Sequence, residues 1–186
     1  MRLFIALDIP DEVRQHLSEY AERVRPYAPD ARWARIESLH VTLKFIGEVT
    51  DSKVQEIQTA LAQVKAQPFQ VEFKNIGFFP TPSSARVFWA GVVASDVLPD
   101  LASAVEESVE KVGIPREKRA YHAHLTLARA PEGSASKHCF RVLQEKLGAE
   151  EPPQFGTMSA QEFFLYRSQI MRGGARYTKL QRYPIQ

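Results

Sequence analysis

Two short segments of the sequence place a histidine two residues before a threonine. They are His40-Val41-Thr42-Leu43 and His124-Leu125-Thr126-Leu127. Histidine exchanges a proton near neutral pH, so one neutral ring can accept a proton while a second, protonated ring donates one. Threonine hydroxyls can donate hydrogen bonds to the non-bridging oxygens of a phosphate, where negative charge must be stabilised. The pair therefore predicts phosphoryl transfer by acid–base catalysis, which needs no nucleophilic serine or cysteine, no metal and no cofactor.

Both segments alternate polar and apolar residues, as a half-buried strand does. His40 and Thr42 share one face of the first strand, and His124 and Thr126 share one face of the second. A single histidine on a strand is usually an ordinary polar residue. Two histidines in the same phase, each followed by a threonine, indicate a common site.

Two neighbouring residues share this phase, and each has two open interpretations. Lys44 either adds positive charge to the site or is an ordinary lysine at a strand end. His122 either contacts the substrate and supports His124, or it is a solvated histidine. A metal site is not expected, because no set of Cys, Asp or Glu ligands accompanies the histidines.

The two motifs belong to an apparent internal repeat. They lie 84 positions apart, and the same offset relates Arg2–Ala6 to Arg86–Ala90. We predict a single two-lobed domain over 1–186, built from repeats of about 1–80 and 85–170 whose lobes can exchange strands. The alternative is that two unrelated amphipathic patterns happen to align.

Hydrophobic periodicity and turn residues predict the elements that must position the motifs. Strands are expected over 2–8, 38–46, 69–79, 85–93, 121–129, 159–170 and 175–183, and helices over 10–25, 51–65, 97–112 and 134–147. Thr50 or Asp51 can cap the second helix, and Gly173-Gly174 suits a tight hairpin turn. The pattern predicts an α+β fold, a bilobal internal duplication with two mainly antiparallel sheets forming a central cleft and helices on the outside.

Composition limits the class of protein. The net charge of the 186 residues is only +2, so contact with a polyanion must come from a local patch. A rim of Arg116, Lys118, Arg119, Arg167, Arg172, Arg176 and Lys179 could supply that patch, although charged runs are usually just solvated surfaces. Cys139 is the single cysteine, so no disulfide forms within the chain, and no apolar run is long enough to span a membrane. We expect a cytoplasmic monomer without membrane contact.

The strings HVTLKFIGEV at 40–49 and HLTLAR at 124–129 closely resemble the paired motifs of RNA 2′,3′-cyclic phosphodiesterases. These proteins are also called 2′-5′ RNA ligases and belong to the two-histidine phosphoesterase superfamily. The opening RLFIALDIP and the late LYRSQI are similar to that family as well, so the resemblance spans nearly the whole chain. One departure is Ala123, where the family usually has proline.

The resemblance implies roles for five residues. His40 corresponds to the proton donor and His124 to the proton acceptor, Thr42 and Thr126 correspond to phosphate-binding threonines, and Arg129 corresponds to a phosphate ligand. Strict alternation places Arg129 on the face opposite His124, so it reaches the site only if the strand ends or bulges there.

The resemblance also implies the reaction and the partner. We expect metal-independent hydrolysis of RNA 2′,3′-cyclic phosphate ends to 2′-phosphomonoester ends, with tRNA halves or small nucleotides as possible substrates. One alternative is 2′-5′ ligation of the cyclic end to a 5′-hydroxyl RNA end, because the same histidines would serve. Another is a non-catalytic RNA-end binder, against which the two intact histidines argue.

Overall fold

The computed structural model describes residues 1–133, 138–172 and 174–185. Within them, the strands are β1 (Arg2–Leu7), β2 (Arg32–Trp33), β3 (Val41–Glu48), β4 (Phe69–Phe79), β5 (Val87–Ala94), β6 (His124–Arg129), β7 (Gln154–Ala160), β8 (Glu162–Met171) and β9 (Gly174–Pro184). The helices are α1 (Asp11–Val24), α2 (Asp51–Leu61), α3 (Val97–Glu110) and α4 (Arg141–Leu147), with short 3₁₀ turns η1 (Arg25–Tyr27), η2 (Ile36–Ser38) and η3 (Pro82–Ser84).

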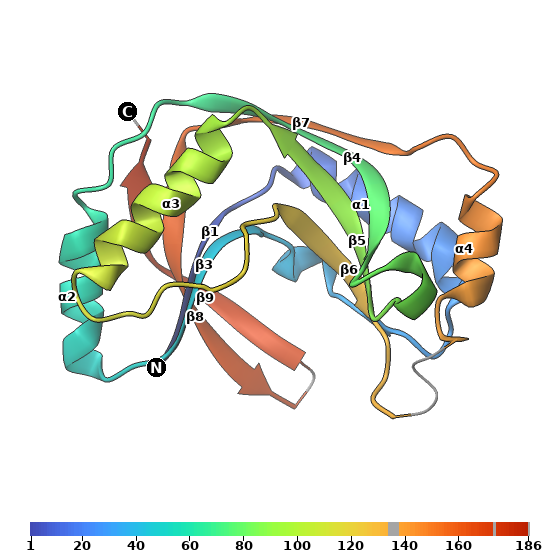
Figure 1. Cartoon of the computed structure of the whole chain (residues 1–186), viewed down its shortest axis with the longest axis horizontal. Helices are drawn as coiled ribbons and strands as arrows, with labels where there is room; N and C mark the ends of the chain where they lie inside the picture. Colours follow the sequence, from blue (N-terminus) through green and yellow to red (C-terminus); the bar gives the residue numbers. More distant parts are fainter. Residues whose placement is uncertain (134–137, 173, 186) are drawn as a thin grey trace.

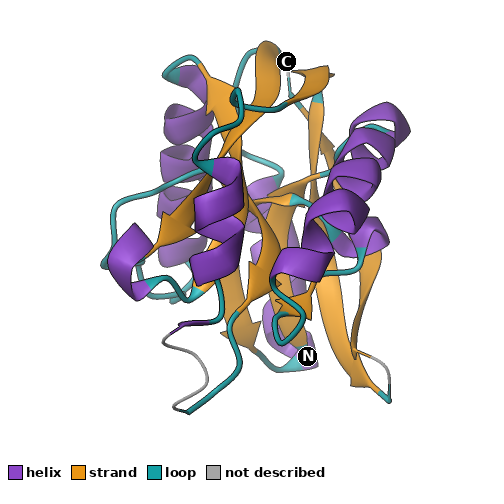
Figure 2. Cartoon of the chain, turned by 90° about the vertical axis from the view of Figure 1, so that its right-hand side faces the viewer, coloured by secondary structure: helices purple, strands orange, loops and turns teal. Residues whose placement is uncertain are grey.

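The strands form two antiparallel sheets, which confirms the predicted α+β class. One sheet has the order β3-β1-β8-β9, and the other has the order β2-β6-β5-β4-β7. In Figure 1, α2 and α3 flank the first sheet, and α1 and α4 flank the second. Seen from the side, the strands run between helices on either side (Figure 2). None of the helices in the described part of the chain is long and apolar enough to cross a membrane.

Strands from both halves of the sequence pair within each sheet. β8 and β9, near the C-terminus, pair with β1 at the N-terminus, and β4 of the first half pairs with β5 and β7 of the second. Each sheet therefore contains strands from both halves of the sequence. This sharing ties the two motif strands, β3 and β6, into one body with a continuous buried core.

The helices form where the sequence predicts amphipathic stretches. In α1, Val13, Leu17, Tyr20 and Val24 are buried on one side. The side chain of Thr50 caps α2 by accepting a hydrogen bond from the Lys53 amide at 3.4 Å. These apolar stripes cover the outer faces of the sheets and leave the opposite faces available for the histidines.

Some predicted boundaries differ from the structure. The predicted strands over 38–46 and 121–129 begin only at Val41 and His124, and the predicted strand over 159–170 is the end of β7 followed by β8. Pairing with neighbouring strands determines where each strand begins and ends. Hydrophobic periodicity in the sequence cannot reveal that pairing. Part of the helix expected over 134–147 and Gly173 of the expected turn lie outside the described residues, and α4 begins at Arg141.

Candidate active site

His40 lies in the short connection between η2 and β3. Its Nδ1 donates a hydrogen bond to the carbonyl oxygen of Ser38 at 2.8 Å. Because a carbonyl can only accept, Nδ1 must carry the proton. The Nε2 atom of the neutral ring is then the basic nitrogen, and it becomes a donor when the ring is protonated.

His124 has the same arrangement in the other sheet. It is the first residue of β6, and its Nδ1 donates to the carbonyl oxygen of His122 at 2.7 Å. In both cases the acceptor is the backbone oxygen two residues earlier. The two histidines therefore have the same tautomer, and a backbone carbonyl orients each ring in the same way. In both rings Nε2 is available for proton transfer.

Aromatic rings surround His40. Its ring stacks on Phe4 at a centroid distance of 4.5 Å, and Tyr177 approaches edge-on at 5.2 Å. Burial lowers the pKa of His40 to about 4, because the protonated ring loses its contact with water. The Ser38 carbonyl and Asp8 act in the opposite direction on this pKa, and Arg14 lowers it further.

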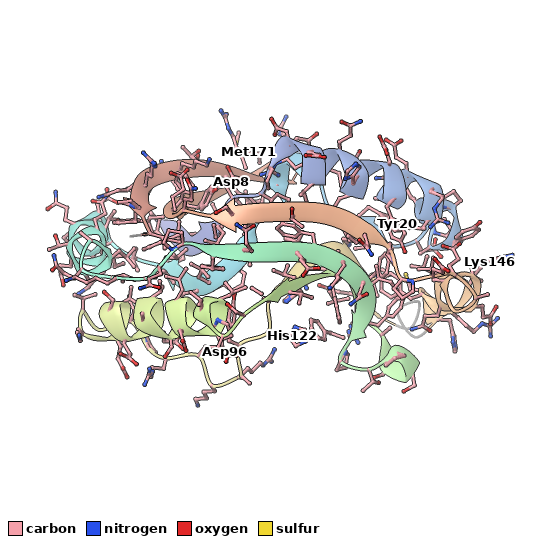
Figure 3. All side chains as sticks on the ribbon, turned by 90° about the horizontal axis from the view of Figure 1, so that it is seen from above. Asp8, Tyr20, Asp96, His122, Lys146 and Met171 are labelled. Atoms are coloured by element: carbon pink, nitrogen blue, oxygen red, sulfur yellow. The ribbon has the colours of Figure 1, made fainter. Side chains whose placement is uncertain are left out.

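His124 lies in a less aromatic and more cationic environment. The ring of Phe79 meets it edge-on at 5.0 Å, and the ring of His122 lies 6.1 Å away. Burial lowers the pKa of His124, and the charges of His122 and Arg129 lower it further. In Figure 3, His122 lies on the side of the sheets away from α1, which carries Tyr20.

The two threonines occupy matching positions. Thr42 lies opposite Ala6 of β1, and Thr126 lies opposite Trp89 of β5. We call the face of each sheet that bears these residues its histidine face. Directly opposed residues of neighbouring strands share a face, so this face includes Phe4, Ala6 and Tyr166 in one sheet and Phe79 and Trp89 in the other.

Each motif strand bulges immediately after its threonine. In β3 the pairing with β1 skips Leu43, and in β6 the pairing with β5 skips Leu127. The bulged leucines obey the 84-residue offset of the motifs. After a one-residue bulge, each following side chain lies on the face of the sheet opposite to the one that simple alternation predicts.

The bulge in β6 returns Arg129 to the histidine face. Arg129 lies opposite Val87, which has the same parity as Trp89, and opposite Arg32 of the edge strand β2. Alternation alone placed Arg129 away from the site unless the strand ended or bulged, and this bulge meets that condition. It also reveals Arg32, which sequence reasoning missed because a two-residue strand leaves no periodic signal.

The bulge in β3 sends Lys44 to the opposite face, beside the core residue Ile5. There Lys44 is buried, forms an ion pair with Glu106 of α3, and donates to the Pro115 carbonyl at 2.7 Å. Lys44 is therefore neither a cation of the histidine face nor an ordinary strand-end lysine. The following residue, Phe45, turns outward.

The segment that leads into β6 is held against β3. The Glu106 carboxylate accepts a hydrogen bond from the Glu117 amide at 2.9 Å, and the hydroxyl of Tyr121 donates to the Thr42 carbonyl at 3.2 Å. Some Cα atoms of β3 and β6 lie within 8 Å of each other. These contacts bring the two motifs together, and they use Tyr121 as a support for β3.

The segment that leads into His40 is held by α1, the helix that packs against β7 of the other sheet. The guanidinium of Arg14 on α1 donates to the carbonyl oxygens of Ile36 at 2.9 Å and Leu39 at 3.0 Å. Asp8 pairs with Arg14 and also with Lys179. Lys179 and Arg116, two members of the predicted basic rim, are therefore engaged with acids, since Arg116 lies 3.7 Å from Glu107.

Comparison with known proteins identifies the family. Residues 7–89 match the model of LigT-like phosphoesterases. The RNA 2′,3′-cyclic phosphodiesterase of Archaeoglobus fulgidus is 33% identical over 97% of this chain and 98% of its own length. The chain belongs to the LigT-like phosphoesterase family.

Solved structures agree with this assignment. Crystalline Escherichia coli LigT with 3′-AMP has a TM-score of 0.80 and 27% identity, covering 99% of this chain and 97% of that chain. The complex of the same protein with phosphate has a TM-score of 0.76 and 27% identity, covering 99% and 96%. The family resemblance inferred from the paired motifs is confirmed.

The described residues of this LigT-like phosphoesterase contain no group of three or more His, Cys, Asp or Glu side chains arranged to hold a metal ion. The side chains gathered at the histidine faces are instead imidazoles, hydroxyls and guanidiniums. Such groups can move protons and bind anionic oxygens directly.

Proposed function

We propose that the protein hydrolyses RNA 2′,3′-cyclic phosphate ends to 2′-phosphomonoester ends without a metal or cofactor. The observation that carries this proposal is the matched support of His40 and His124. Each ring donates from Nδ1 to the backbone oxygen two residues earlier, at 2.8 and 2.7 Å. Each precedes a threonine, and the two motif strands lie in different sheets with some of their Cα atoms within 8 Å of each other. Matched rings with free Nε2 atoms suit proton donation and acceptance at one phosphorus.

In the proposed reaction, Nε2 of His124 takes a proton from the water that attacks phosphorus. The bond between phosphorus and the ribose 3′ oxygen breaks, and Nε2 of His40 gives its proton to that oxygen. Thr42 and Thr126 donate hydrogen bonds to the non-bridging oxygens, and Arg129 binds them as a cation. Arg32 faces Arg129 across the strand pair, and an anion between them would offset the repulsion of two like charges.

In this mechanism the negative charge of the substrate must change the protonation state of His40. Burial favours the neutral form of both imidazoles, and it lowers the pKa of His40 to about 4. A proton donor must be protonated when the reaction begins. The negative phosphodiester therefore has to raise the pKa of His40 on binding, as an opposite charge close to a buried cation does.

The names and ligands of the relatives support the same class of substrate. The Archaeoglobus protein is named an RNA 2′,3′-cyclic phosphodiesterase, and E. coli LigT has been crystallised with 3′-AMP and with phosphate. We extend RNA as the substrate to this chain, with tRNA halves and small nucleotides as the two substrate sizes to compare. We further propose that it acts as a monomer in the cytoplasm.

The proposal is tested with a short RNA that ends in a 2′,3′-cyclic phosphate, in the presence of EDTA. Phosphorus NMR should detect a 2′-phosphomonoester as the product. His40→Ala and His124→Ala should each lower the rate by roughly 10²- to 10⁴-fold, whereas His138→Ala, at an exposed histidine near α4, should leave it unchanged. Persistence of the cyclic end would contradict the proposal, and a product joined to an added 5′-hydroxyl RNA would indicate ligation instead.

A further inference from the structure

His122 has a counterpart in the first motif that carries a different side chain. The residue 84 positions earlier is Ser38. The carbonyl oxygen of Ser38 accepts the hydrogen bond of His40 at 2.8 Å, and the carbonyl oxygen of His122 accepts that of His124 at 2.7 Å. Because both residues orient the next histidine through the backbone, this support does not require an imidazole at position 122. The side chain of His122 is therefore available for another role.

The ring of His122 lies on the histidine face, beside aromatic rings from two strands. Its centroid lies 5.0 Å from that of Phe79 on β4 and 5.5 Å from that of Trp89 on β5, and both contacts are edge-on. The centroid of the His124 ring is 6.1 Å away. His122 is exposed, and in residues 1–133, 138–172 and 174–185 its one hydrogen bond to a side chain is the one that its carbonyl accepts. The imidazole is thus open to water and close to His124.

The charges that act on His124 are all positive. Burial lowers the pKa of His124, and the charges of His122 and Arg129 lower it further. The described residues contribute no acid to this set. A positive charge is better tolerated on the exposed ring of His122 than on the half-buried ring of His124, because the exposed ring stays in contact with water. A proton on His122 then opposes a second proton on His124, as in any coupled pair.

The charges that act on His40 are of both signs. Burial is again the largest influence and lowers the pKa of His40 to about 4. Arg14 lowers this pKa further, whereas Asp8 raises it, and these two side chains form an ion pair with each other. Their effects on His40 therefore largely offset. The residue at the position of His122 is Ser38, whose side chain carries no charge.

We propose that His122 makes His124 the proton acceptor, by holding beside it a positive charge that the first motif lacks. This inference rests on the proposed function. The negative phosphodiester favours the protonated form of both catalytic rings. At His124 the charge of His122 opposes that effect. Around His40 the effect is unopposed, because Arg14 and Asp8 offset each other. His122 is thus a positioning residue, which acts through His124 and does not touch the reacting atoms.

The test replaces His122 by the serine of the first motif. His122→Ser should lower kcat/KM for adenosine 2′,3′-cyclic phosphate on the acid side of the pH maximum by roughly 3- to 100-fold, the effect of one charge 6.1 Å away in water or near a protein surface. The alkaline side should be unchanged, because neither imidazole of the second motif is protonated there, and the maximum should move to higher pH. His122→Lys, which restores a positive charge, should restore the wild-type profile. His138→Ser, at an exposed histidine near α4, is the matched control and should change nothing.

Nitrogen NMR of the free protein gives a readout that needs no turnover. In His122→Ser the pKa of His124 should rise, whereas that of His40 should stay the same. Equal pKa values of His124 in wild type and His122→Ser would overturn the inference alone. So would a higher KM at every pH without a change at His124, because His122 would then be a direct ligand of the substrate. Failure of the wild-type protein to hydrolyse the cyclic phosphate would overturn the proposed function and the inference with it.

Discussion

The surroundings of His40 and His124 differ although the support of the two rings is the same. Each ring donates from Nδ1 to the carbonyl oxygen two residues earlier. His40 stacks on the buried ring of Phe4, whereas His124 meets Phe79 edge-on and lies close to His122 and Arg129. The motif thus sets the same tautomer in both rings, and burial favours the neutral form of both. In the proposed mechanism the negative substrate must then raise the pKa of His40 so that this ring can act as the donor.

Each of the two segments that precede His40 and His124 is held by an ion pair and its hydrogen bonds, which we call a clamp. The two clamps differ in burial. Arg14, on the helix that packs against β7, holds the segment before His40, and Lys44 with Glu106 holds the segment before His124. The segment before each histidine is therefore held by side chains from the elements of the opposite sheet. The side chains of Lys44 and Glu106 are 5% and 20% exposed, against 18% and 33% for Arg14 and Asp8. The more buried clamp should be the more costly one to break.

Removing one side of each clamp should produce the largest difference between the two regions. Lys44→Met leaves the Glu106 carboxylate without its cation, and the free energy of unfolding should fall by about 3–5 kcal/mol. Arg14→Met, at the less buried clamp, should cost about 1–3 kcal/mol. Urea unfolding followed by circular dichroism measures both.

A double variant controls for the charge left behind. Replacing both partners, Lys44→Met with Glu106→Leu, should recover much of the stability, because no buried charge remains unpaired. A loss for Lys44→Met no greater than that for Arg14→Met would show that the two clamps are equivalent.

The arginines near His124 offer a smaller and more specific comparison. Arg129→Ala should raise KM for a cyclic phosphate by roughly 10- to 100-fold, which is the contribution of a charge-assisted hydrogen bond. Arg32→Ala should raise it less, because Arg32 lies on the edge strand one step further from His124. Steady-state kinetics measure both values, with Arg23→Ala on α1 as the control. A larger effect at Arg32 than at Arg129 would reverse the proposed order of the two cations.

The pH dependence of kcat/KM is the smallest of the expected effects. It tests how burial controls the protonation of His40 and His124. The reactive form has one protonated and one neutral histidine, and its population is highest midway between the two pKa values. His40 has a pKa of about 4, and the pKa of His124 is also lowered from 6.5, so kcat/KM should be maximal below pH 6.5. Below that maximum the acceptor becomes protonated, and above it the donor loses its proton.

Opening the His40 environment should move this maximum in a known direction. Tyr177→Ala removes the ring that meets His40 edge-on at 5.2 Å, so water should raise the pKa of His40 and shift the kcat/KM maximum upward. A wild-type maximum at pH 7 or above would mean that burial does not control the charge of these rings in the free protein.

Local patterns predicted most of the helices and strands and singled out both motif histidines. They could not predict β2, the break between β7 and β8, or the bulges. The amphipathic stripe of Val13, Leu17 and Tyr20 identified α1, and alternation placed Thr42 and Thr126 on the same faces as in the structure. Alternation failed one residue later in both strands. Simple alternation along the strand predicts an exposed Lys44 and a buried Phe45. The structure has the reverse, because Leu43 is skipped in the pairing with β1.

The 84-residue offset has a similar limit. The offset matches the two motif strands residue by residue, including their bulged leucines. It fails for β1 and β5, where residues at the same offset lie on different faces of their sheets. Ile5 is buried in the core, whereas Trp89, at the same offset, lies on the histidine face. Register between distant strands depends on tertiary pairing, so no single-sequence pattern could reveal it. Descent of the two halves from one duplicated unit stays a prediction.

The central claim is that both imidazoles act on one phosphate, and nitrogen NMR of histidine-labelled protein tests it most directly. Titration with inorganic phosphate should shift the Nε2 resonances of His40 and His124 together, with one dissociation constant and one phosphate per chain. Both Nδ1 atoms should keep their protons throughout. Shifts of only one ring, or two rings that respond with different dissociation constants, would contradict the account.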